Sequence, residues 1–224
     1  MNDALLDRLD QVSSDSVVEG FAIAPGTVKN NLDAMSEGRV QVHIPAAPDF
    51  DPWARLPAVG GGSGRGFCWI PQIDDEVLVA FAQNDPSAAY VLGGLWSTKD
   101  RPPLSIPTDF LSKRTIMTGI SDAPGHKVEF DDLLQSITIT SSTSQKVTID
   151  PLKIELTNMA GTLAITMDNT SQSITIKAAA KLTLDAPMIA IGGETTQQVQ
   201  LQGTTIGLQA TGPCTVTGLP IKLN

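Results

Sequence analysis

The sequence of 224 residues is poor in the side chains on which many enzymes and disulfide-bonded folds depend. Its two cysteines, Cys68 and Cys214, are too few for a disulfide scaffold or a four-cysteine zinc site. Two histidines, His43 and His126, leave little material for histidine-based catalysis. No apolar run approaches the ~18 residues that a membrane-spanning helix needs. We therefore expect neither a membrane-spanning protein nor a small disulfide-rich one.

Positive charge is also scarce. The chain has 15 Lys and Arg residues against 24 Asp and Glu residues, which gives a formal net charge of −9. A general nucleic-acid binder needs Lys and Arg to displace counterions from phosphates, so this balance argues against a nucleic-acid partner. The first twenty residues carry five acids and one base, Arg8, a pattern that does not fit a signal peptide. We expect synthesis in the cytoplasm without such a leader.

Aromatic residues are absent from the last part of the chain. All ten lie at or before Phe130, and residues 134–224 carry 17 threonines with five acids and five bases. The first part can therefore build a core around aromatic anchors. The second part has only aliphatic side chains to bury, so its core must be narrow or shared between chains.

The first part reads as one short helix followed by strands. Leu5, Leu6 and Leu9 recur at helical spacing within residues 4–12, which predicts an amphipathic helix that needs a neighbouring surface for stability. Runs with strand character, separated by turn signals, follow at residues 20–29, 38–44, 52–59, 67–70, 76–81 and 90–95. Such strands in so short a stretch predict a five-stranded Greek-key barrel of the oligonucleotide/oligosaccharide-binding (OB) kind.

The second part repeats a short motif with two apolar residues at positions i and i+2. The repeats start roughly 7–11 residues apart and predict about eleven very short strands, typical of a solenoid or fibre. The pairs are Ile137/Ile139, Val147/Ile149, Ile154/Leu156, Leu163/Ile165, Ile174/Ile176, Leu182/Leu184, Ile189/Ile191, Val199/Leu201, Ile206/Leu208, Cys214/Val216 and Ile221/Leu223.

Two arrangements can close such a core. A single-chain solenoid with three segments per turn would have few turns and two ends to cap. Three chains wound together, each supplying one strand per face in rotation, would pair the strand edges along the whole shaft. The residues alone leave both open. The thin, purely aliphatic interior favours three chains.

Several motifs of the first part carry a family resemblance. They are Gly38-Arg39-Val40-Gln41-Val42, Trp53-Ala54-Arg55-Leu56-Pro57, Gly64-Arg65-Gly66-Phe67, the run PQIDDEVLVAF at residues 71–81, Asp85-Pro86 and the run YVLGGLW at residues 90–96. This stretch resembles the OB domain of central spike proteins of contractile injection machines. These are the phage baseplate assembly protein V family and the VgrG-type spikes of type VI secretion and extracellular injection systems. The run GHKVEFDD at residues 125–132 resembles the lead into the β-helix of that family, and residues 210–224 resemble its end.

The resemblance implies an all-β homotrimer with an OB barrel and an intertwined triple-stranded β-helix. Its parts would be a hub-contact segment (residues 1–19), the barrel (20–103), a linker (104–133) and the spike (134–224). The implied function is mechanical: at the tip of a phage tail or an injection particle, the spike is driven through the target cell envelope when the sheath contracts. The resemblance also implies a separate trimeric hub protein, contacted through Leu5, Leu6 and Leu9. A lysozyme domain does not fit between barrel and shaft.

The tip of the shaft gives a further expectation. Some spikes of this family hold iron at an apical His-x-His motif, but no histidine follows His126. We therefore expect no metal site and a blunt end closed by a separate PAAR-type tip protein. Leu219, Pro220, Ile221 and Leu223 would present the apolar base for that cap. We expect no cofactor.

The remaining chemical candidates favour structural roles. Residues 60–66 (GGGSGRG) match no phosphate-binding motif and predict a loop. Asp74-Asp75-Glu76 is typical of a charged turn, and His43 of the polar face of a strand. Cys68 is expected to be buried. The three tryptophans Trp53, Trp69 and Trp96 are interpreted as core or interface anchors rather than base-stacking platforms.

Two other functions remain as alternatives. One is a β-helical tailspike or adhesin that binds or cleaves glycans, which would need paired carboxylates along a groove. The acids of residues 134–224 are scattered instead: Asp150, Glu155, Asp168, Asp185 and Glu194. The other is an OB-fold nucleic-acid module, which the net charge opposes. We therefore predict a protein without catalytic residues.

Overall fold

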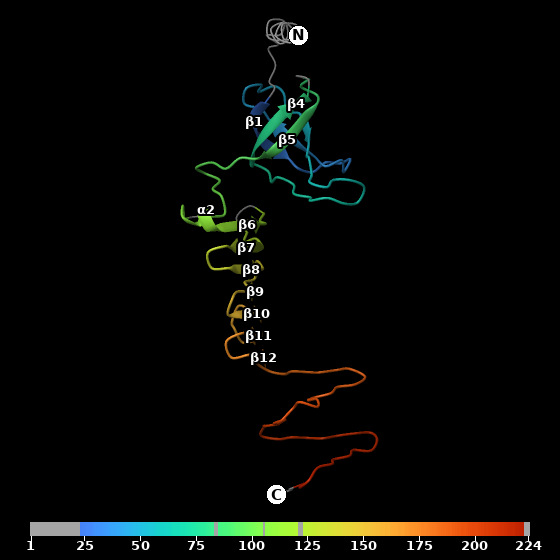
Figure 1. Ribbon diagram of the computed structural model, residues 1–224. Coiled ribbons are helices and arrows are strands. Elements are labelled where there is room, and N and C mark those ends of the chain that lie inside the picture. The colour runs from blue at the N-terminus through green and yellow to red at the C-terminus, as the bar shows by residue number, and fades with distance from the viewer. Residues whose placement is uncertain (1–22, 83–84, 105, 121–122, 222–224) are drawn as a thin grey trace, which may run out of the picture. The chain divides into compact units, whose positions relative to one another are not determined.

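The computed structural model describes residues 23–82, 85–104, 106–120 and 123–221 and is nearly all β (Figure 1). The chain divides into two compact units, Met1–Ala179 and Ala180–Asn224. Within the described ranges, the model contains no helix of the length and apolarity that crossing a bilayer requires. The predicted N-terminal helix, with Leu5, Leu6 and Leu9, lies outside these ranges.

The first unit begins with a closed five-stranded barrel. Its strands are β1 (Ile23–Asn30), β2 (Arg39–His43), β3 (Trp53–Arg55), β4 (Glu76–Phe81) and β5 (Ala89–Gly94). They close in the order β1-β2-β3-β5-β4, with β3 and β5 parallel and the other pairs antiparallel. The predicted OB-like barrel is therefore confirmed.

The core of the barrel comes from strict alternation along its strands. In β2 and β4 every second side chain is buried, and Val40, Val42, Val77 and Val79 have no exposed surface. β-branched residues suit this pleated surface, because their restricted χ1 rotamers pack well between neighbouring strands. The remaining buried core side chains are Ala24, Val28, Ile44, Ala54, Phe81, Ala89 and Val91.

Two predicted strands of this region differ from the structure. The strand expected at residues 52–59 is limited to β3, and residues 67–70 form no strand. Pro57 and Pro71 have no backbone N–H to donate to a ladder, and both stretches lead into the long connection between β3 and β4. The glycine-rich residues 60–66 lie in this connection as the predicted loop, with an isolated bridge between Gly62 and Arg65.

Beyond the barrel, one helical turn and a seven-stranded antiparallel sheet complete the first unit. The turn is α2 (Asp109–Ser112). The strands are β6 (Lys113–Met117), β7 (Lys127–Asp131), β8 (Ser136–Thr140), β9 (Lys146–Ile149), β10 (Lys153–Thr157), β11 (Ala164–Asp168) and β12 (Ser173–Lys177). Each strand pairs with the next one along the chain (Figure 1).

Side-chain oxygens close the tight turns of this sheet. Asp131 Oδ1 accepts hydrogen bonds from the backbone N–H groups of Leu133 and Leu134 at 3.1 and 3.0 Å after β7. Asp150, directly after β9, and Asp168, the last residue of β11, accept two backbone N–H bonds each in the same way, at 2.8–2.9 Å. These hydrogen bonds fix turns that the backbone alone would leave open. Two of the scattered acids are thus turn-forming residues.

The pairing within the sheet corrects the expected winding. We predicted that each chain would supply one strand per face in rotation, but the strands of residues 113–177 form hairpins with their own neighbours. Gln135, Ser144 and Gln172 adopt positive φ values of 51–62° in the connecting turns, which lets the chain reverse within a few residues. The sheet also begins at Lys113, within the stretch 104–133 that the sequence predicts as a linker.

The described part of the second unit, residues 180–221, contains no strand. The backbone hydrogen bond found there joins the N–H of Thr196 to the carbonyl oxygen of Gly193, at 2.9 Å. All its described residues are exposed. Among the described residues, the repeats predicted from Leu182 onward therefore form no strand and have no strand partner.

Candidate assembly surfaces

The seven-stranded sheet carries two continuous apolar rows on one face. Strand register aligns them, so that every position is apolar except Arg114 of β6. The first row is Arg114, Phe130, Ile137, Ile149, Ile154, Met167 and Ile174, and the second is Ile116, Val128, Ile139, Val147, Leu156, Ile165 and Ile176. Side chains of neighbouring strands in such a row contact one another directly.

The described residues of the chain leave most of these rows unburied. Most of their apolar side chains are exposed, from 37% at Ile137 to 68% at Ile174, and Val128 and Val147 are half-buried. Fully burying one such side chain is worth roughly 1.5–3 kcal/mol, so an uncovered face of this length is costly in water. Contiguous exposed apolar patches of this kind mark interaction surfaces.

The opposite face of the sheet is polar and needs no cover. Its central row contains Thr138, Thr148 and Thr166, interspersed with Glu129 and Glu155. Lys153 Nζ lies 2.8 Å from Glu155 Oε2, and Lys127 pairs with Glu129 in the same manner. Threonine and paired charges suit a solvated β surface. The sheet therefore has one polar face and one apolar face.

The final described residues form a small apolar surface. Val216, Thr217, Gly218, Leu219 and Ile221 line an open hollow of about 610 Å³. Leu219 is fully exposed and Ile221 is half exposed. The predicted tip residues Leu219, Pro220 and Ile221 are therefore accessible, whereas Leu223 falls outside the described residues.

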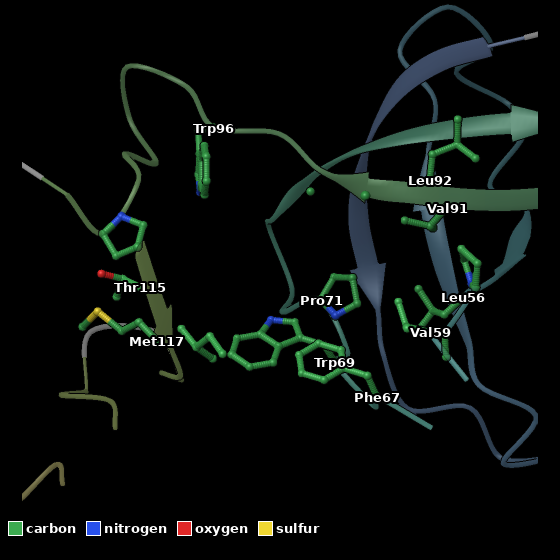
Figure 2. A pocket seen from close by; sticks show the side chains of 16 residues that line it. Leu56, Val59, Phe67, Trp69, Pro71, Val91, Leu92, Trp96, Thr115 and Met117 are labelled. Carbon is green, nitrogen blue, oxygen red and sulfur yellow. The ribbon is translucent and has the colours of Figure 1, made fainter. Parts of the chain in front are cut away.

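The long connection between β3 and β4 adds an aromatic surface that the sequence did not predict. Phe67 and Trp69 stack with ring centroids 5.6 Å apart and an interplanar angle of 7° (Figure 2). They help line a pocket of about 520 Å³, together with Trp96 after β5 and with Ile116 and Met117 of β6. The sequence signal for this stack is the placement of two aromatic residues, Phe67 and Trp69, on either side of Cys68.

Exposure decides how these side chains are interpreted. Trp69 is 46% and Trp96 is 70% exposed, and Trp53 is also exposed, so none of the three anchors the core of this chain. Interface anchoring remains the prediction for them. The expected burial of Cys68 is wrong, because the residue lies in an irregular, exposed stretch between two outward-facing rings.

The candidate chemical groups occupy structural positions. Asp75 Oδ2 accepts the backbone N–H of Gln72 at 2.8 Å and shapes the turn before β4. His43 Nδ1 lies 2.7 Å from Asp51 Oδ1, and Lys29 Nζ lies 2.8 Å from Asp51 Oδ2. These two hydrogen bonds, the one from Lys29 first, lower the pKa of the Asp51 carboxyl. Among the residues that the structure describes, no three His, Cys, Asp or Glu side chains lie close enough together to bind a metal ion.

The barrel matches one known family of OB domains. Residues 24–96, from β1 to just beyond β5, match the family described as the type VI secretion system/phage-baseplate injector OB domain. This match and the relatives below confirm the predicted resemblance of the barrel to the OB domain of baseplate and VgrG spike proteins.

Curated relatives agree with this assignment. The chain is 28% identical over 102 residues to the actin cross-linking toxin VgrG1 of Vibrio cholerae and to the type VI secretion system spike protein VgrG3 of that species. It is 29% identical over 92 residues to the type VI secretion system spike protein VgrG5 of Pseudomonas aeruginosa. These alignments cover 38–42% of this chain but 9–12% of the relatives, so the chain matches about a tenth of their length.

Proposed function

We propose that this chain forms a homotrimeric central spike that pierces a target cell envelope when a contractile sheath drives it forward. The observation that carries this proposal is the pair of apolar rows on β6–β12, which the described part of the chain leaves largely exposed. Two further copies supply the missing cover. The function is mechanical and requires neither a catalytic group nor a cofactor.

The shaft of this trimer has two parts with different strand pairing. Along residues 113–177 each chain contributes one complete sheet, and three such sheets pack their apolar rows inward as the faces of a prism. From residue 180 onward the three chains wind together as a triple-stranded β-helix. The alternating aliphatic pairs of this part, and its lack of strand partners among the described residues, support pairing between chains.

The two ends bind different proteins. Leu5, Leu6 and Leu9 contact a trimeric hub at the baseplate or tail tip. Leu219, Pro220, Ile221 and Leu223 form the base for a PAAR-type tip protein. The assembly belongs to the tail tip of a virion or to an injection particle.

Each contact has its own test. Leu5→Asp with Leu9→Asp should abolish capture of the hub protein in a pull-down, while the matched Gln11→Asp retains it. Leu219→Asp with Ile221→Asp should abolish capture of the tip protein, while Thr215→Asp retains it. Equal capture by an apolar-site variant and its control contradicts the assignment of that end.

Electron micrographs of the purified full chain test the spike itself. Negatively stained particles should show three barrels at the base of one thin rod. Separate single-chain particles without a rod would contradict the proposal. Unheated SDS gels add a second test, because the part of the rod from residue 180 onward, whose strands pair across three chains, cannot lose one chain without breaking the pairing of the others.

A further inference from the structure

A second pocket, of about 580 Å³, lies on the outer face of the barrel. It is lined by Glu37, Arg39, Trp53, Arg55, Ser87, Ala88, Ala89 and Tyr90. These residues come from β2, β3 and β5 and from the loops that precede β2 and β5. OB barrels commonly bind their ligands on this face and its two loops.

One arginine of this pocket is fully engaged. Arg39 donates to both carboxylate oxygens of Asp33, from Nε at 3.2 Å and from Nη2 at 3.0 Å, and its Nη1 lies 3.1 Å from Glu37 Oε2. The same guanidinium lies over the ring of Trp53, 5.8 Å from its centroid. The Arg39 guanidinium therefore contacts the ring of Trp53, and its positive charge is already paired with Asp33 and Glu37 and is not available to a ligand.

The other arginine is uncompensated. Arg55 lies directly opposite Arg39 in the strand register, and its guanidinium sits over the ring of Tyr90, 5.9 Å from the centroid. Among the described residues no carboxylate pairs with it, and its side chain is exposed. A guanidinium held in one orientation is suited to a carboxylate, which it can bind through two parallel hydrogen bonds.

The path of the chain brings acidic residues of its own within reach. Cross-strand register joins Ile23, Ala80, Tyr90 and Arg55 in one row around the barrel. Ile23 is the first described residue, and three strand spacings of about 4.8 Å, together about 15 Å, separate it from Arg55. An extended chain covers about 3.3 Å per residue, so the eight residues from Ile23 back to Asp15 span more than this distance.

We propose that residues 15–19 (DSVVE) of the same chain bind in this pocket, with the Asp15 carboxylate paired with Arg55 and Val17 against the ring of Tyr90. The pair is exposed and weak by itself, but the tether makes the contact intramolecular and raises its effective concentration. Leu5, Leu6 and Leu9 remain available to another protein. This docking concerns the barrel alone, so it does not depend on the proposed trimer.

Hydrogen exchange of the full chain tests the docking. We expect exchange of the backbone amides of residues 16–19 to become about two- to fivefold faster in Arg55→Gln and in Asp15→Asn. The matched controls are Arg101→Gln, an exposed arginine outside the pocket, and Asp7→Asn; both should leave this exchange unchanged. Equal exchange in all five proteins, at unchanged circular dichroism, overturns the proposal.

Chemical cross-linking identifies which carboxylate lies next to position 55 and whether it belongs to the same chain. In Arg55→Lys, a zero-length carbodiimide should join position 55 to Asp15, which mass spectrometry detects after proteolysis. The same reagent should not join position 101 to Asp15 in Arg101→Lys. With mixed light and heavy isotope-labelled chains, the product should be purely light or purely heavy. Absence of the product, or products that join light to heavy chains, contradicts binding within one chain.

Discussion

Ile165 of β11 lies directly opposite Ile176 of β12, and the two side chains keep 44% and 52% of their surfaces exposed. Two aliphatic neighbours that remain so open within a paired sheet need a surface from elsewhere. The same holds along both apolar rows, and this is the physical basis of the proposed trimer.

Reversing the polarity of one row position should break the assembly. In Ile165→Asp three carboxylates would converge inside the shaft, each costing several kcal/mol when desolvated. We expect the trimer band on an unheated SDS gel to disappear and light scattering to report single chains. Thr166→Asp places the same charge on the polar face and should leave the trimer intact. Loss of the trimer in both variants, or in neither, would show that the rows do not face inward.

Gly26 should be essential for the stability of the barrel. A Cβ at this position of β1 would clash with Val42 Cγ1 and would lie 2.9 Å from the carbonyl oxygen of His43. Gly26→Ala should therefore destabilise the barrel by about 1–3 kcal/mol through overpacking. Denaturant unfolding followed by tryptophan fluorescence measures the change. Gly93→Ala in β5, where a Cβ meets nothing within 4 Å, is the control, and equal midpoints would contradict the packing around β1.

The turn before β2 should make barrel stability depend on acid pH. The hydrogen bond from Arg39 lowers the pKa of the Asp33 carboxyl to about 2. Because the folded pKa is below the unfolded value, this stabilisation is complete above pH ~4 and is lost as pH falls through 2. Asp33→Asn should lower stability at pH 7 and flatten its dependence on pH between 4 and 2. The exposed carboxylate of Asp49 provides the control, Asp49→Asn, whose pH profile should follow that of the unmodified chain.

Gly125 should control the hairpin that starts the sheet. A Cβ there would clash with the backbone carbonyl group of Thr118, whose N–H donates to the carbonyl oxygen of His126 at 2.9 Å. We expect Gly125→Ala to speed hydrogen exchange in β6 and β7 while β10–β12 keep their protection. Gly119→Ala, with its nearest neighbour at 3.7 Å, should leave β6 and β7 unchanged. Unchanged exchange in both variants would contradict the close approach at Gly125.

The sequence indicated the barrel well because its strands alternate cleanly. The alternation of apolar and polar residues alone predicts that Val40 and Val42, like Val77 and Val79, are buried. The register of the sheet was harder to predict, as the repeat at Leu163 and Ile165 shows. Asn158 closes the preceding turn by accepting hydrogen bonds from the N–H groups of Thr162 and Leu163, so the paired apolar residues of β11 are Ile165 and Met167.

Strand order could not be predicted for a related reason. A two-residue apolar repeat suits both a strand that pairs with the next in its chain and one that pairs with another chain. The choice depends on the turns, where Gln135 and Gln172 adopt the positive φ values usually given to glycine or asparagine. The Phe67–Trp69 stack and the Arg55–Tyr90 contact depend on the folded loop and strand geometry and escaped prediction as well.

The mass of the purified full chain in solution tests the central claim most directly. Sedimentation at micromolar concentration should report a single species of three chains, each of 23.6 kDa, that persists in SDS until boiled. A stable single chain of 23.6 kDa with intact β structure would mean that the apolar rows need no cover, and would contradict the spike.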